Sequence, residues 1–135
     1  MPRRHVVPSL FPPPGYAHAA VVEAGERLVF TAGGVPLDAE GELVGPGDRP
    51  VQTRRVLANL DAALREAGSA LEHVVATEVY VVAERDEDLY AVWDEVRASG
   101  LSTGPHASTL LGIARLGYPG QLVEITAVAT VPERP

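Results

Sequence analysis

Glu124 is the first carboxylate to consider as a functional residue, because its neighbours in the sequence, near the C-terminus, are apolar and β-branched. Residues 121–131 are typical of a β-strand, in which successive side chains point to opposite faces. Val123 and Ile125 then belong to a fully apolar face, and Glu124 lies on the other. An ionised carboxylate there needs a partner, water or a ligand, since burying it alone is unfavourable. Glu124 is therefore a candidate for contact with a ligand, or it pairs with an arginine.

His106 and Ser108 form a second candidate group at the start of the preceding expected strand, residues 106–115. Their equal parity places both side chains on one face of that strand. Histidine can carry charge near neutral pH, and serine offers a short hydrogen-bonding hydroxyl. We expect this strand and 121–131 to be joined by a turn that contains Gly117, Pro119 and Gly120.

Composition excludes several kinds of chemistry. The chain has no cysteine and no lysine, so a thiolate nucleophile and a lysine Schiff base are both excluded. A metal site from His18, His106 and Glu124 is conceivable by ligand type, but no spacing supports it. We expect no metal and no other cofactor. The net charge of -7 argues against a nucleic-acid partner.

The elements that position these residues are expected in the order strand, strand, helix, strand, helix, strand, strand. Asp48 is a plausible N-cap for a helix over residues 50–67, and a second helix is expected over 86–98. Residues 1–14 are expected to be irregular, and a β-branched run favours a strand within 71–82. A hairpin of strands is expected at 19–22 and 27–31. The order predicts an α+β fold, a mixed sheet with two helices on one face, in a single domain over residues 1–135.

Two helices on one face leave the other face of the sheet uncovered. We expect that face to carry the apolar residues Leu110, Leu122 and Val128, and self-association to cover it. No apolar run approaches the ~20 residues of a membrane span, and prolines interrupt the N-terminus, so no signal peptide is expected. The expectation is a cytoplasmic protein with no membrane partner.

Several segments, taken in order, resemble the reactive intermediate deaminase family (YjgF/RidA, L-PSP endoribonuclease-like). They are GYAHAA, LVFTAGGVP, QTRRVLANLDAALREAGSALEHVVATEVYV and VEITAVA. The resemblance implies a chorismate-mutase-like fold and a homotrimer whose sheets pack into a central barrel. It also implies small-molecule clefts between subunits, and hydrolysis of imines and enamines. In such members an arginine clamps the substrate carboxylate, a carboxylate positions water, and a tyrosine and a glycine line the cleft.

The family residues fall on this sequence with one departure. The tyrosine resembles Tyr16, the glycine Gly33 and the water-positioning carboxylate Glu124, whereas the arginine position falls on Ser108. Arg115 lies an odd number of residues further on, roughly 20 Å away and on the other strand face, so it is not a substitute.

Two histidines are candidates for holding the ligand in place of the arginine. His106 shares the face of Ser108, and His18 follows Tyr16 closely in the sequence.

Three functions stay open at this point. The first is an imine or enamine hydrolase acting on an atypical substrate, with Glu124 positioning water and Ser108, His106 or His18 holding the ligand. The second is a non-catalytic trimer that binds a small molecule. The third, an endoribonuclease, is disfavoured by the acidic charge and the missing arginine.

Overall fold

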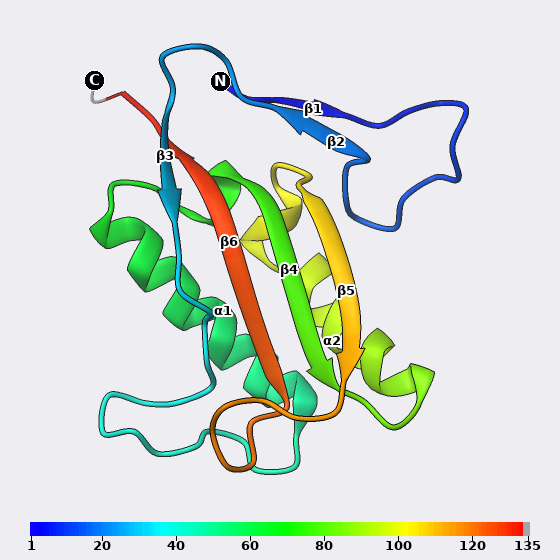
Figure 1. Cartoon of the computed structure of the whole chain (residues 1–135), viewed down its shortest axis with the longest axis vertical. Coiled ribbons are helices and arrows are strands. Elements are labelled where there is room, and N and C mark those ends of the chain that lie inside the picture. Colours follow the sequence, from blue (N-terminus) through cyan, green and yellow to red (C-terminus); the bar gives the residue numbers. More distant parts are fainter. Residues whose placement is uncertain (134–135) are drawn as a thin grey trace.

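A computed structural model describes residues 1–133 of the chain (Figure 1). A four-stranded sheet lies in front of two α-helices, and a separate two-stranded sheet lies at one end. In chain order the elements are β1 Arg3–His5, β2 Ala19–Val21, β3 Arg27–Phe30, α1 Arg49–Glu66, η1 Leu71–His73, β4 Val74–Val82, α2 Asp86–Arg97, η2 Gly100–Ser102, β5 Ala107–Ile113 and β6 Val123–Val131.

The main sheet is mixed, with the strand order β3-β6-β4-β5. β4 and β5 run parallel, and the other neighbouring pairs are antiparallel. β5 and β6 are consecutive in the chain but not neighbours, because β4 lies between them. The turn after β5 therefore carries the chain past β4, and β5 is left as an edge strand.

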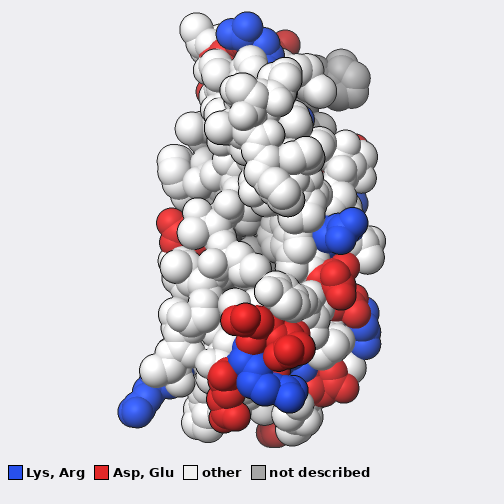
Figure 2. Space-filling model, turned by 90° about the vertical axis from the view of Figure 1, so that its right-hand side faces the viewer, with Lys and Arg blue, Asp and Glu red and all other residues white. Residues whose placement is uncertain are grey.

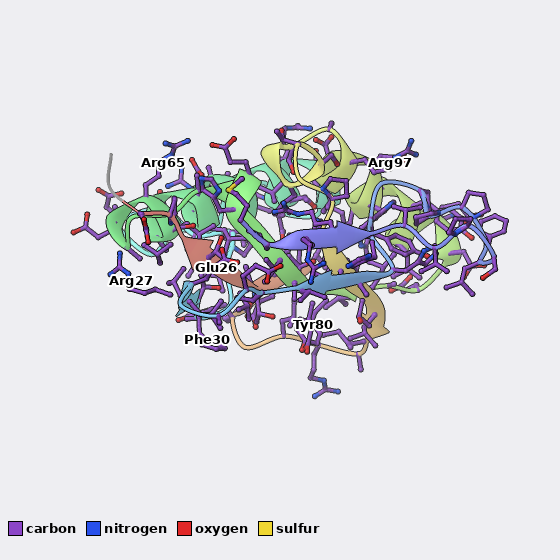
Figure 3. All side chains as sticks on the ribbon, turned by 90° about the horizontal axis from the view of Figure 1, so that it is seen from above. Glu26, Arg27, Phe30, Arg65, Tyr80 and Arg97 are labelled. Atoms are coloured by element: carbon purple, nitrogen blue, oxygen red, sulfur yellow. The ribbon has the colours of Figure 1, made fainter. Side chains whose placement is uncertain are left out.

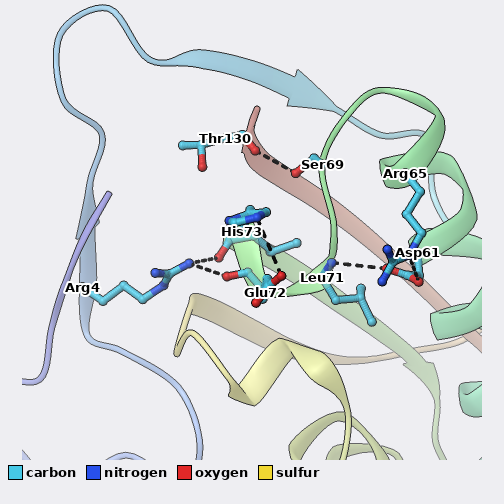
Figure 4. Close-up of polar contacts among 9 residues, drawn as sticks. Arg4, Asp61, Arg65, Ser69, Leu71, Glu72, His73 and Thr130 are labelled. Carbon is cyan, nitrogen blue, oxygen red and sulfur yellow. Dashed lines mark hydrogen bonds and ion pairs between the residues drawn. The ribbon is translucent and has the colours of Figure 1, made fainter. Parts of the chain in front are cut away.

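The expected hairpin of strands 19–22 and 27–31 is wrong. β2 pairs with β1, in the segment expected to be irregular, and β3 pairs with the last strand, β6. Arg4 of β1 explains why this segment is ordered: its guanidinium donates to the carbonyl oxygens of Glu72 and Val74, at 3.0 and 3.1 Å (Figure 4). This contact joins the first strand to η1 and to the start of β4.

Both helices cover the same face of the sheet, as the sequence predicted. α1 begins after Asp48, whose carboxylate accepts a hydrogen bond from the backbone N–H of Val51 at 2.9 Å. Its apolar stripe, with Val56, Leu60 and Leu64, is buried against the sheet. Within residues 1–133, neither helix is long and apolar enough to cross a membrane.

The alternation predicted for the last strand is confirmed. Val123, Ile125, Ala127 and Ala129 are buried on the helix side, and Glu124 lies on the face that the helices leave open. Seen from above, Phe30 and Tyr80 also project from this open face (Figure 3). Phe30 is 72% exposed, and Leu28 and Leu111 are also exposed there.

Candidate functional site

Two adjoining hollows lie near the start of β5, and Tyr16, Ser108 and Thr109 line both of them. The larger, which we call the polar hollow, has a volume of about 540 Å³ and opens on the uncovered face of the sheet. The smaller, the aromatic hollow, has a volume of about 430 Å³ and lies between β5 and α2. Figure 2 shows this side of the molecule, where charged side chains gather at the lower end and the hollowed middle is nearly free of them. The other residues of the polar hollow are Ala17, His18, Phe30, Thr31, Ala76, Thr77, Glu78, Ala107, Thr126, Ala127 and Val128.

Ser108 lies on the helix side of the sheet, and this corrects an expectation. The register pairs it with Thr77, whose buried hydroxyl is 2.7 Å from the Ser108 hydroxyl. Leu110 has the same parity and packs against the core, so it does not belong to the open face as predicted. Sequence parity shows which residues of a strand share a face, but it does not show which face meets the helices.

Tyr16 is held in position by a cluster of aromatic rings. Its ring meets Trp93 at a centroid distance of 6.1 Å and His18 at 6.0 Å, both edge to face. The indole N–H of Trp93 donates to the carbonyl oxygen of Pro14 at 2.7 Å, which attaches this segment to α2. The neighbouring backbone N–H of Ala17 donates to the carbonyl oxygen of His106, so the segment lies along the start of β5.

His18 lines the polar hollow, but both of its ring nitrogens are engaged with the N-terminal segment. The backbone N–H of Val7 donates to Nδ1 at 2.9 Å, so Nε2 carries the hydrogen and donates to the carbonyl oxygen of Phe11 at 3.0 Å. The ring in this arrangement is neutral and orders the loop before Tyr16. Its role as a ligand-holding residue stays a prediction.

His106 lies in the core and does not line either hollow. The side chain is fully buried beside Trp93, and burial lowers its pKa to about 4, so the ring is neutral at neutral pH. Nδ1 lies 3.3 Å from the carbonyl oxygen of Leu101, and the backbone of the segment preceding β5 turns the ring into the core. The sequence did not reveal this burial, and the role of His106 as a catalytic or ligand-holding residue stays a prediction.

Glu124 lies on the open face beside Gly33. The amide nitrogen of Gln121 donates to one carboxylate oxygen at 3.1 Å. A Cβ atom on residue 33 would lie 2.4 Å from the other oxygen, so only glycine leaves room for the carboxylate in this position. The structure thus brings together Gly33 and Glu124, which the sequence had placed in one site.

Tyr80 lies directly across from Glu124 in the β4–β6 register and extends this polar row. Its hydroxyl donates to the carboxylate of Glu78. That hydrogen bond, followed by desolvation and by the charges of Glu78 and Glu124, raises the pKa of Tyr80. The open face therefore carries two carboxylates and a neutral phenol near its centre.

Ser108 and Glu124 are too far apart in one chain to contact one small ligand. Ser108 aligns with Ala127 across β4, and Glu124 is three residues further along β6. Two strand spacings and three residue rises give a Cα separation of about 14 Å. Their side chains also point to opposite faces of the sheet, so one chain divides the predicted site residues into two groups.

Several residues near the two hollows and near Glu124 were not identified as candidates from the sequence. Trp93 and Tyr90 belong to the second expected helix and were not singled out as candidates, yet both line the aromatic hollow. Gln121, which contacts Glu124, and Thr77, which contacts Ser108, were not singled out either. The contact of Thr77 depends on the pairing of β4 with β5, which the sequence does not show. Among residues 1–133, no three histidine or carboxylate side chains gather in a way that could hold a metal ion.

Comparisons with known proteins identify the family. The model of the family described as endoribonuclease L-PSP matches residues 11–131. The 3-aminoacrylate deaminase RutC of Acinetobacter baylyi is 30% identical over 97% of this chain and 100% of its own length. A RutC family protein of Pyrococcus abyssi is 34% identical over 87% of this chain and 89% of its own.

A solved structure supports the same conclusion. A Rid-family protein of unknown function from Yersinia pestis, YyfB, is 35% identical, with a TM-score of 0.88 over 96% of this chain and 98% of its own. The α+β architecture, with a mixed sheet and two helices, agrees with that of the solved members. This chain therefore belongs to the YjgF/RidA family.

Proposed function

We propose that the protein is a deaminase-type hydrolase, in which Glu124 positions the water that attacks an imine carbon. The observation that carries the proposal is the placement of the Glu124 carboxylate, which Gln121 holds in the space left by Gly33. The relative from Acinetobacter baylyi that is named a 3-aminoacrylate deaminase supports the same class of reaction.

The reaction needs only water and a base. An enamine first takes up a proton from the solvent at carbon and becomes an iminium ion, and an imine reaches the same state by taking up a proton at nitrogen. Water then adds to the iminium carbon as a carboxylate accepts one of its protons, and the resulting neutral carbinolamine loses ammonia to leave a carbonyl compound. Ammonia leaves with the proton that the carboxylate had accepted, so Glu124 returns to its starting state.

The proposed site includes residues of two chains. Because Ser108 and Glu124 of one chain are about 14 Å apart on opposite faces, a shared ligand needs Glu124 from a second copy. The uncovered face with Leu28, Phe30 and Leu111 offers the apolar surface for that contact. We assign this face to a homotrimer whose sheets form a central barrel, with the ligand clefts between subunits.

A ligand-binding protein without catalysis is the second candidate. No arginine or lysine lines the polar or the aromatic hollow in the described part of the chain, so the usual clamp for a substrate carboxylate is missing there. A cleft that keeps its shape without the clamp is suited to binding alone.

Ammonia release from freshly generated imines distinguishes the two candidates. Imines formed in situ by an amino-acid or amine oxidase are mixed with the purified protein, and the rate is compared with a buffer blank. We expect a rate above the blank that Glu124→Gln removes, and that Glu40→Gln, a change on an exposed loop, leaves intact. No rate above the blank with any imine would leave the binding function.

A further inference from the structure

The aromatic hollow has walls suited to a flat apolar group. Its lining consists of Pro14, Tyr16, Tyr90, Trp93, Ser108, Thr109 and Leu110. The indole N–H of Trp93 is already bonded to Pro14, so Trp93 offers the hollow its apolar ring. Tyr90, which is 59% exposed, forms the rim. Aromatic rings pack well against flat apolar groups in such settings.

The two hollows offer a ligand no arginine or lysine in the described part of the chain. Glu78 is the one carboxylate among the described residues that line the polar hollow, and no carboxylate lines the aromatic hollow. A ligand carboxylate entering here would lose hydration without gaining a cation. It would also approach a group of like charge. The site therefore disfavours the anionic group that an arginine clamp would select.

The hydroxyls of Ser108 and Thr77 provide a neutral recognition group. They are 2.7 Å apart and share one hydrogen bond, so one of the two hydroxyl hydrogens stays free. When Thr77 donates, Ser108 keeps its hydrogen for a ligand. This hydroxyl suits an uncharged acceptor, such as an imine nitrogen or a carbonyl oxygen, at the boundary between the two hollows.

We infer that the ligand is an uncharged imine or enamine that carries a flat apolar group, such as an aromatic ring. Its ring occupies the aromatic hollow, and its C=N or C=O group lies at Ser108. This substrate class rests on the proposed function for the hydrolytic step, but the binding preference can be tested without turnover.

Trp93 provides the test, because it is the only tryptophan of the chain. Phenylacetamide and phenylacetate have nearly the same shape and differ in charge. Each is titrated into the full-length protein while tryptophan fluorescence is recorded. We expect phenylacetamide to bind at least roughly tenfold more tightly, a factor that corresponds to about 1.4 kcal/mol. Equal or tighter binding of phenylacetate, or no response to either compound, overturns the inference.

Two variants and one control variant test which residues determine the preference between the two compounds. Ser108→Arg should reverse the preference in favour of phenylacetate, and Tyr90→Ala should weaken binding of phenylacetamide. Tyr118→Ala, at an exposed tyrosine outside both hollows, should change neither. If Ser108→Arg does not fold, the comparison of phenylacetamide with phenylacetate in the unmodified protein still tests the inference.

The hydrolytic step is judged separately by ammonia release. Tight binding of phenylacetamide without hydrolysis of any imine overturns the proposed catalysis and leaves the ligand class intact. Hydrolysis of small carboxylate-bearing imines, together with a preference for phenylacetate, overturns the ligand class alone.

Discussion

At the scale of single residues, the function depends on where each polar side chain is held. Glu124 has a hydrogen-bonding partner in Gln121 and open space at Gly33, whereas His106 is enclosed in the core. Both stood out in the sequence, yet of the two only Glu124 lies on the open face of the sheet.

Gly33→Ala should reduce imine hydrolysis without unfolding the protein. The new methyl group would lie 2.4–2.7 Å from atoms of the Glu124 side chain, which must then rotate away. The backbone at residue 33 has no positive φ, so the free energy of unfolding should change by less than about 1 kcal/mol. Ammonia release and urea unfolding measure the two effects. Gly117→Ala, where no atom lies within 4 Å, is the control, and an unchanged rate in Gly33→Ala would contradict the role of Glu124.

His106 should make the fold sensitive to mild acid. Its pKa is about 4 in the folded chain and 6.5 when unperturbed, so the unfolded state binds more protons between these values. Stability is therefore fully present above pH 6.5 and is lost as the pH falls toward 4, by about 3 kcal/mol in total. Urea unfolding at pH 7 and pH 4.5 measures this loss.

The variant His106→Leu isolates the contribution of this side chain. It should lose less stability than the parent between the two pH values, while His5→Leu, at an exposed histidine, should match the parent. Identical pH dependence in His106→Leu and the parent would show that His106 is not the titrating group.

At the scale of elements, α1 and β6 were predictable because local rules determine them. Asp48 caps α1, and the alternation from Val123 to Ala129 separates the buried from the open face. Both features follow from periodicity and from hydrogen bonds between near neighbours.

Strand order was not predictable in the same way. β3 pairs with β6 across most of the chain, and β4 separates β5 from β6, so no local signal marks either pairing. The position of Ser108 on the helix side follows from that order, as does its distance from Glu124. The candidate residues were visible in the sequence, but their division into two groups was not.

Asp48→Ala should destabilise the fold by about 1 kcal/mol. The aspartate accepts the Val51 N–H, and a lost N-cap typically costs this amount. Urea unfolding at neutral pH measures the change, with Glu40→Ala on an exposed loop as the control. No difference between the two variants would mean that the cap contributes nothing to the stability of α1.

At the scale of the whole molecule, the open face of the sheet is the surface through which we expect the proposed trimer to form. Leu28 is 42% exposed on this face and lines neither hollow. We expect the parent chain to have a mass near three times 14.3 kDa in solution. Leu28→Glu should lower that mass, because repelling charges would meet where apolar side chains pack. Leu10→Glu, at a residue of similar exposure away from the main sheet, should leave the mass unchanged. Light scattering coupled to size-exclusion chromatography gives the masses.

The most direct test of the account is the rate of ammonia release per chain in single chains and in the assembly. Leu28→Glu supplies folded single chains, with circular dichroism as the check on folding. The account predicts hydrolysis of a fresh imine by the parent assembly and no rate above the blank for the single chains, because Glu124 must come from a second copy. Full activity in folded single chains would contradict a site shared between copies.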